Sequence, residues 1–448
     1  MNREVFKVVI VSKFGGSVTS SAEGIKRAME IVKSDSSRRY VIASAPGSTF
    51  SSTGITDMLF MCHSAHSRHE DYSGLLVKIS ECFMNIADGL GMKFDIDAEI
   101  SALEKDLLSW KNLDYIGSRG EYIMGKMLAA YLGWDFVDAS SIIFFNSDGS
   151  LNESKTFTES KAKLSRLEHA VIPAFYGSLP DGRIKTFPRG DGDSSGAIAA
   201  CAVNADMFEK WSETAKAYSA DPSVVKNPKV ITNITYSEAV ELNYSGIFTV
   251  NDSVIFMLRK AGIPLMIRSI DDANDAGMMI SANLPEGISR STAMCIAGRR
   301  NFYIVHIEKY GLNKQEGFGE KLFGLFAKYH VPCEHCLSGI HKMSVVVKSQ
   351  MFILHHRQLL EEIRRVIEPD SVSVEKDLSL IAVIGKGMGT VKGTFESVFF
   401  AMVSAQIKVR MIDQGADDLN IIIGVSDEDY ERAIKVLYEY VIQGKEKI

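Results

Sequence analysis

The chain has 448 residues, of which 46% are apolar and 24% are charged, and its formal net charge is −6. This length is too great for one ordinary hydrophobic core, so two or three domains are expected, and the negative charge argues against nucleic acid as a partner. No apolar run approaches the roughly 18 residues that cross a bilayer, and a strand begins too early to leave room for a signal peptide. We therefore expect a cytosolic protein with no membrane partner.

The first part of the chain, residues 1–290, alternates predicted strands and helices. This alternation predicts an α/β fold in which an open, mainly parallel sheet is covered by helices on both faces. Ligands of such a sheet bind outside the carboxyl ends of its strands. In chain order, the predicted elements are strand 5–12, helix 22–34, strand 39–44, helices within 57–110, helix 120–132, strands 136–138 and 169–176, helix 195–203, strand 206–211, helices 236–244 and 252–261, and strand 264–268.

The pattern changes after about residue 290, where two copies of a β-α-β-β-α unit follow one another. We expect two small βαββαβ modules, at 291–376 and 377–448, and one can be inserted in the other. Repeated modules of this kind pair their sheets and hold a small ligand, which favours a regulatory role. The first copy has predicted strands 302–308, 331–337 and 343–348 with helices 319–329 and 355–366; the second has strands 380–385, 407–412 and 419–425 with helices 393–404 and 427–441.

Two glycine-rich loops carry the chemistry. The first strand runs into Lys13-Phe-Gly-Gly-Ser17, and Arg189-Gly-Asp-Gly-Asp-Ser-Ser-Gly196 opens an apolar helix. A strand fixes the lysine, while glycines let the backbone turn tightly and direct its N–H groups at an anion. Two anion-binding loops indicate a kinase that holds nucleotide and acceptor side by side.

Seven segments in order resemble the aspartokinases, which have the amino-acid kinase fold followed by paired ACT domains. The likeness implies ATP-dependent phosphorylation of the β-carboxylate of L-aspartate, the first step towards lysine, threonine and methionine, with feedback inhibition at the ACT domains. It implies Mg²⁺ held mainly by phosphates and water rather than by a protein metal site. The segments are Lys13–Ser17, Gly117–Tyr122, Val171–Gly177, Arg189–Asp193, Trp211–Pro222, Gly317–Leu322 and Met411–Gly415.

The resemblance assigns roles to residues near both loops. It places Lys13 across the transferred phosphate and Asp193 beside it as its orienting group; a solvated lysine and a helix cap are the alternatives. It assigns Arg189 to a carboxylate of the acceptor, with a catalytic part, and Glu121 to the ammonium group, where a surface arginine and a first-turn acid are the alternatives. Hydroxyl contacts would come from Ser17 and Thr56. A carboxylate acceptor is already ionised at neutral pH, so the reaction needs no general base.

The nucleotide side matches the family less well. Expected contacts come from Lys13, Gly15, Gly16, Ser17, Ser212, Glu213, Tyr218, Asp221 and Pro222. Ser223 stands where the family has an arginine, and Phe248 where it has a lysine, so two cations expected near the phosphates are missing. We considered Lys216, Lys226 and Lys229 as replacements from other backbone positions.

The regulatory half offers a candidate effector site at Gly317, Phe318, Gly319, Glu334 and Ser338, with lysine or threonine as the expected effector. Backbone N–H groups at a helix start suit a carboxylate, and Glu334 suits an ammonium group. A homodimer through the ACT sheets is expected, and the alternative is that the modules serve only as that interface. Two rival functions stay open: a kinase of another amino acid or carboxylate, and a sensor with weak or no kinase activity.

Overall fold

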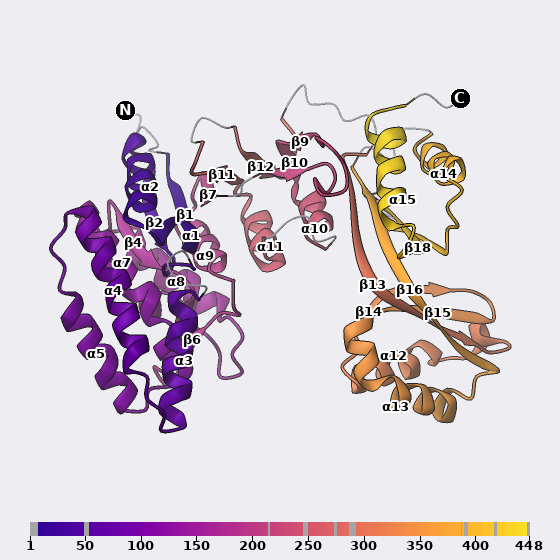
Figure 1. The fold of residues 1–448 in the computed structure, drawn as a ribbon, viewed down its shortest axis with the longest axis horizontal. Coiled ribbons are helices and arrows are strands. Elements are labelled where there is room, and N and C mark those ends of the chain that lie inside the picture. Colours follow the sequence, from indigo (N-terminus) through magenta and orange to yellow (C-terminus); the bar gives the residue numbers. More distant parts are fainter. Residues whose placement is uncertain are drawn as a thin grey trace. The chain divides into compact units, whose positions relative to one another are not determined.

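The computed structural model describes residues 8–48, 53–213, 216–244, 250–272, 276–285, 293–386, 388, 393–415 and 419–445. The chain forms two compact units (Figure 1). The first contains Met1–Ala217, Thr232–Tyr236 and Val250–Pro285, and the second contains Tyr218–Ile231, Ser237–Thr249 and Glu286–Ile448. Within the described ranges, no helix is long and apolar enough to cross a membrane.

The first unit is built on an eight-stranded sheet with the order β10-β12-β11-β7-β1-β2-β4-β3. The run from β11 to β3 is parallel, β12 is antiparallel to β11, and β10 is parallel to β12. The predicted mainly parallel sheet is confirmed. The strands are β1 (Ile10–Phe14), β2 (Arg38–Ala43), β3 (Asp135–Phe136), β4 (Ala170–Pro173), β7 (Met207–Ser212), β10 (Asn233–Thr235), β11 (Leu265–Ser269) and β12 (Met278–Ser281).

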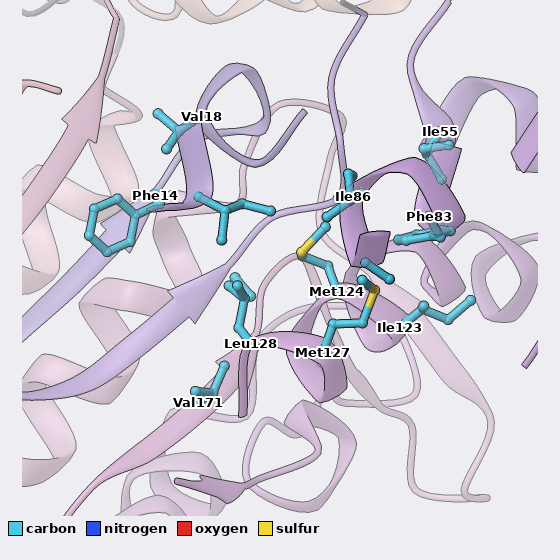
Figure 2. Packing of buried hydrophobic residues seen from close by; sticks show 14 of the residues in the cluster. Phe14, Val18, Ile55, Phe83, Ile86, Ile123, Met124, Met127, Leu128 and Val171 are labelled. Atoms are coloured by element: carbon cyan, nitrogen blue, oxygen red, sulfur yellow. The ribbon is translucent and has the colours of Figure 1, made fainter. Parts of the chain in front are cut away.

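Helices cover both faces of this sheet. One face is packed by α2 (Ala22–Ser34), α3 (Ile55–Ser67), α4 (Ser73–Leu90), α5 (Ile96–Leu108) and α7 (Arg119–Leu132), and Figure 2 shows Met124, Met127 and Leu128 of α7 in that core with Phe14 of β1. On the other face, α9 (Asp193–Val203) packs against β1 and β7 and against α8 (Glu153–Leu164) and α11 (Asp252–Ala261). Because successive side chains of a strand point to opposite faces, Phe14 enters the first core while Lys13 points towards α9.

The remaining elements are short. They are α1 (Gly16–Thr19), α6 (Leu113–Gly117), the hairpin of β5 (Tyr176–Ser178) and β6 (Ile184–Thr186), the pair of β8 (Ala217–Tyr218) and β9 (Val230–Ile231), and α10 (Tyr236–Tyr244). Single turns are formed by Ala139–Ser141 and Leu312–Lys314, and a π-helical turn by Tyr438–Ile442.

The second unit holds a six-stranded antiparallel sheet with the order β14-β15-β13-β16-β18-β17. Its two central strands, β13 and β16, have 14 residues each and pair along their whole length, so both modules share them. The elements are β13 (Cys295–Glu308), α12 (Phe318–Lys328), β14 (Cys333–Ser338), β15 (Lys342–Lys348), α13 (Ser349–Ile367), β16 (Ser371–Ile384), α14 (Thr394–Ser404), β17 (Met411–Gln414), β18 (Asn420–Ser426) and α15 (Tyr430–Leu437).

Each module uses a different part of the two shared strands β13 and β16. β15 pairs with the later part of β13, from Phe302 onward, and this end packs with α12 and α13. β18 pairs with the later part of β16, from Leu378 onward, and this end packs with α14 and α15. The predicted strands 302–308 and 380–385 were therefore too short. A pairing irregularity near Arg299, with Asn301 at φ 71°, and charged residues 375–377 made continuous strands look interrupted.

Candidate active site

A buried ion triad lies at the carboxyl end of β1. The Nζ atom of Lys13 is 2.8 Å from Oδ1 of Asp193, the first residue of α9. The other carboxylate oxygen, Oδ2, is 2.6 Å from Nζ of Lys210 in β7. The side chain of Asp193 is 6% exposed, and those of the two lysines are 10% and 15% exposed. The structure thus brings together the lysine of the first glycine-rich loop and the second aspartate of the other loop.

The two lysines of this triad determine the protonation state of Asp193. Burial alone would raise the pKa of Asp193, but the ammonium groups of Lys13 and Lys210 outweigh it and hold the pKa at about 2. Asp193 is consequently an anion at neutral pH, and both lysines are held by it. The helix-cap alternative is not borne out in geometry, because Gly192 is the cap residue of α9 and the carboxylate is turned to the lysines.

Two glycines meet beside the triad. The Gly47 N–H donates to the Gly16 carbonyl at 2.8 Å, and a Cβ on Gly47 would lie 3.0 Å from the carbonyl carbon of Gly16. Neither position has room for a side chain, so the backbones of the loops after β1 and β2 are in direct contact. Gly190, in the loop that precedes α9, adopts φ 83°, a left-handed conformation that glycine accepts without strain. All three glycines line one cavity with Lys13.

A cavity of about 400 Å³ opens next to Lys13. This volume lies in the range of small-molecule sites. It gathers the sequence-predicted acceptor residues Thr56, Glu121 and Arg189 with Lys13 and Gly16. Ser17, predicted to add a hydroxyl, is exposed in the first turn of α1 and is not part of this lining. The rest of the lining is Ser44, Ala45, Pro46, Gly47, Ser48, Gly54, Asp57, Ala174, Phe175, Gly190 and Gly192.

Glu121 is the most perturbed acid of this cavity. Its side chain is buried, Oε1 accepts a long 3.4 Å hydrogen bond from the Thr56 hydroxyl, and among the described residues no group hydrogen-bonds Oε2. Burial raises the pKa of Glu121 to about 8. Hydrogen bonds and the charge of Arg119 lower this pKa, but burial outweighs them, so a ligand that brings a positive charge would stabilise the carboxylate.

Arg189 stands at the mouth of the cavity. Its guanidinium forms an ion pair with Asp57 of α3 and lies 5.5 Å from the ring centre of Phe60. The side chain is 66% exposed, so the arginine can exchange Asp57 for a ligand carboxylate at little desolvation cost.

A larger groove of about 1140 Å³ also has Arg189 in its lining. Its lining includes Phe60, Phe187 and Phe256 and is mainly apolar. Lys13, Glu121 and the contact between Gly16 and Gly47 belong to the smaller cavity, and phosphoryl transfer depends on charge and positioning. The smaller cavity is therefore the candidate active site.

Known proteins with a similar sequence and structure identify the family of this chain. A model of the amino acid kinase family matches residues 8–269, and a model of the ACT domain matches residues 381–440. The crystal structure of the Clostridium acetobutylicum aspartate kinase is 35% identical, with a TM-score of 0.89 over 98% of this chain and 100% of that one. The chain belongs to the aspartokinases of the amino acid kinase family. The predicted fold, a kinase domain followed by ACT modules, is confirmed.

Other aspartokinases extend the comparison. Aspartokinase 3 of Bacillus subtilis is 29% identical over 97% of this chain and 99% of its own length. The fold is also that of E. coli aspartokinase III, solved in complex with aspartate and ADP, at 21% identity and a TM-score of 0.75 over 97% of this chain and 100% of that one.

The aspartokinase nucleotide segment is divided between the two units. Ser212 ends β7 in the first unit, and the carbonyl of Glu213 accepts from the Ser269 hydroxyl at 3.3 Å. Tyr218, Asp221 and Pro222 belong to the second unit. There, Oδ1 of Asp221 accepts from the N–H and the hydroxyl of Ser223, at 2.8 and 2.7 Å. Phe248 lies outside the described residues. The nucleotide roles of these residues stay predictions.

Sequence reasoning missed one residue of this aspartokinase site, Lys210. It considered Lys216, Lys226 and Lys229 as replacement cations, and the Nζ of Lys229 instead donates to the Ile442 carbonyl at 3.3 Å in the second unit. The signal that would have found Lys210 is register: Lys13 and Lys210 are paired residues of the neighbouring parallel strands β1 and β7.

The predicted effector residues lie at one end of the ACT sheet. α12 begins at Phe318 after Gly317, which adopts φ 70°, and Gly319 follows in the first turn. On β14, the nearly buried Glu334 pairs with Lys348 at 3.2 Å, and the exposed Ser338 ends the strand. An ammonium ligand at Glu334 would compete with Lys348, and effector binding here stays a prediction.

The next feature is the arrangement of side chains that could bind a metal ion. Over the ranges that the structure describes, no three His, Cys, Asp or Glu side chains form a group that could hold a metal ion. Cys333 and Cys336 are free thiols.

Proposed function

We propose that the protein transfers the terminal phosphoryl group of Mg·ATP to the β-carboxylate of L-aspartate, giving 4-phospho-L-aspartate and ADP. This reaction is the first step towards lysine, threonine and methionine. The observation that carries the proposal is the Lys13–Asp193 pair at the edge of a cavity that also holds Glu121 and Arg189. A cation for a phosphoryl group, a buried acid for an ammonium group and an arginine for a carboxylate together fit an acidic α-amino acid.

The residues divide the work as follows. Glu121 binds the ammonium group of aspartate, with Thr56 beside it, and Arg189 exchanges Asp57 for the α-carboxylate. The β-carboxylate is ionised and attacks without a general base. Lys13 neutralises charge on the phosphoryl group as it moves, and Asp193 keeps the ammonium group of Lys13 in place.

Phosphates fit beside the triad on physical grounds. Two ammonium groups face one carboxylate in the triad, and the glycine-lined turns at Gly16 and Gly47 lie beside Lys13. Ammonium groups and tight glycine-rich turns are what polyphosphate sites use. Gly15, Ser17, Ser212, Glu213, Tyr218, Asp221 and Pro222 complete the proposed nucleotide contacts.

We further propose that residues 1–290 are the catalytic domain and that the modules at 291–376 and 377–448 form a regulatory half that dimerises through its sheets. Lysine or threonine would bind at the start of α12 and at Glu334 of β14. The buried side chain of Glu334, paired with an ammonium group from Lys348, supports an amino-acid ligand there because it already accepts that kind of charge.

The test is trapping of the acyl phosphate. Purified protein is incubated with Mg·ATP, hydroxylamine and one acceptor at a time: L-aspartate, N-acetyl-L-aspartate, L-glutamate or succinate. Hydroxamate is expected with L-aspartate alone. A signal with another acid instead supports a different acceptor, and binding of amino acids without any hydroxamate supports a sensor.

A matched pair of variants controls the trapping assay. Lys13→Met is expected to lower the rate by roughly a hundredfold or more, since it removes a charge aimed at the moving phosphoryl group. Lys26→Met changes the net charge equally on an exposed position of α2 and is expected to keep the wild-type rate. Equal rates in both variants would exclude the proposed role of Lys13.

A further inference from the structure

Two buried lysines lie side by side on neighbouring strands of the sheet. Lys13 and Lys210 are paired residues of parallel neighbouring strands, whose backbones lie about 4.8 Å apart. Both side chains leave the same face of the sheet and reach the same carboxylate, that of Asp193. Like charges directly opposite each other on neighbouring strands are destabilising, so a second lysine at this place calls for an explanation. An ion pair with Asp193 would need only one lysine.

The position of Lys210 separates it from the acceptor. The acceptor cavity lies over the ends of β1, β2 and β4, because Lys13, Ser44 and Ala174 line it. β7 lies on the other side of β1 in the sheet order. Lys210 therefore flanks Lys13 on the side away from the acceptor, and the segment that starts with Ser212 continues from the same strand.

We propose that Lys210 is a phosphate-binding catalytic residue, which contacts the nucleotide phosphates on the leaving-group side of Lys13. It supplies positive charge from β7 where this chain has Ser223 and Phe248 in place of the two basic residues that the resemblance leads one to expect. The proposal deepens the proposed kinase function and rests on it for the chemical step, although binding of the nucleotide does not depend on the identity of the acceptor.

The charge balance of the reaction gives Lys210 its task. As the bond between the terminal phosphorus and its bridging oxygen breaks, negative charge grows on that oxygen while a new bond forms to the acceptor carboxylate. Lys13 lies between the nucleotide and the acceptor, and Lys210 neutralises the charge that stays with the nucleoside diphosphate. Both ammonium groups are set in advance by Asp193, so little reorganisation is needed.

The experiment compares binding of ATP and AMP, measured by calorimetry, in the wild-type protein and in Lys210→Met. ATP is expected to bind roughly ten- to a hundredfold more weakly to the variant, as for the loss of a hydrogen bond between charged groups, while AMP binding changes less than about twofold. Lys26→Met, the exposed control, should leave both affinities unchanged. A variant that binds ATP as tightly as this control, or that loses ATP and AMP equally, would overturn the proposal.

A measurement on the wild-type protein covers the case in which Lys210→Met does not fold. Reductive methylation of lysines is followed by mass spectrometry, and ATP, but not AMP, is expected to protect Lys210. Equal methylation of Lys210 with and without ATP contradicts the proposal. The outcomes are also separable from the function: a wild-type protein that binds ATP in a Lys210-dependent way yet makes no aspartyl hydroxamate refutes the proposed acceptor and leaves this inference standing.

Discussion

Replacing Asp193 by asparagine tests whether the triad is held by charge. Asn keeps the shape of the side chain, so the change leaves no cavity and removes only the anion between Lys13 and Lys210. At separations of 2.8 and 2.6 Å, each pair has a Coulomb energy of ~6 kcal/mol at an effective dielectric constant of about 20, before desolvation is subtracted. Removing one partner of a buried pair costs ~3–5 kcal/mol. That loss is a large share of the ~5–15 kcal/mol by which domains are stable.

Urea unfolding followed by tryptophan fluorescence measures this loss. The three tryptophans, Trp110, Trp134 and Trp211, all lie in the first unit, so their emission reports the unfolding of that unit. A second variant, Lys210→Met in the Asp193→Asn background, should recover part of the stability, because it removes one of the two ammonium groups that have lost the charge of Asp193.

The control for this prediction is Asp271→Asn. Asp271 pairs with Arg27 at 2.7 Å, but the two side chains are 55% and 43% exposed. An exposed pair contributes ~0–1 kcal/mol, so this variant should remain close to the wild type. If Asp193→Asn were no more destabilised than Asp271→Asn, the reasoning from buried charge would be refuted.

Three further predictions follow from the cavity, the glycine contact and the ACT sheet. At pH 7 a group with a pKa of about 8 is ~90% protonated, so binding of aspartate should release ~0.9 proton from Glu121. The release is measured by calorimetry in buffers of different ionisation enthalpy, and Glu121→Gln should release none. Equal proton release from Glu121→Gln and the wild-type protein would contradict the assignment of Glu121 to the ammonium group. Gly47→Ala should lower kcat/KM at least about tenfold, since its Cβ would meet the backbone of the facing loop, whereas Gly74→Ala, in open space, should not change it. Glu334→Gln should weaken lysine or threonine binding roughly tenfold by calorimetry relative to the exposed Glu361→Gln, and equal affinities would move the effector site elsewhere.

Much of the kinase half could be predicted from local patterns. The helix predicted at 22–34 is α2, because Ser21 caps it and its apolar residues recur with helical spacing. The meeting of Lys13 with Asp193 was expected from the family resemblance, and the structure brings the two side chains together at the carboxyl end of β1.

Other features depend on neighbours that are distant in the chain. Lys210 stands in a short strand between Glu209 and Trp211, and it resembles an ordinary strand lysine unless β7 is known to pair with β1 in this register. Glu121 could be assigned to an ammonium group only by resemblance, because its raised pKa comes from burial that no local pattern reveals. The shared strands β13 and β16 were missed for the same reason, since pairing across 14 residues overrides polar residues at the bend.

The most direct test of the account is a ³¹P NMR spectrum of the reaction with labelled acceptor. The protein is given Mg·ATP and L-aspartate carrying ¹³C either at the β-carboxyl carbon or at the α-carboxyl carbon, with Lys13→Met as the inactive control. The account predicts an acyl-phosphate resonance that is split by the β-carboxyl label and not by the α-carboxyl label, and that is missing with Lys13→Met. No acyl phosphate, splitting by the α-carboxyl label, or an undiminished signal from Lys13→Met would contradict it.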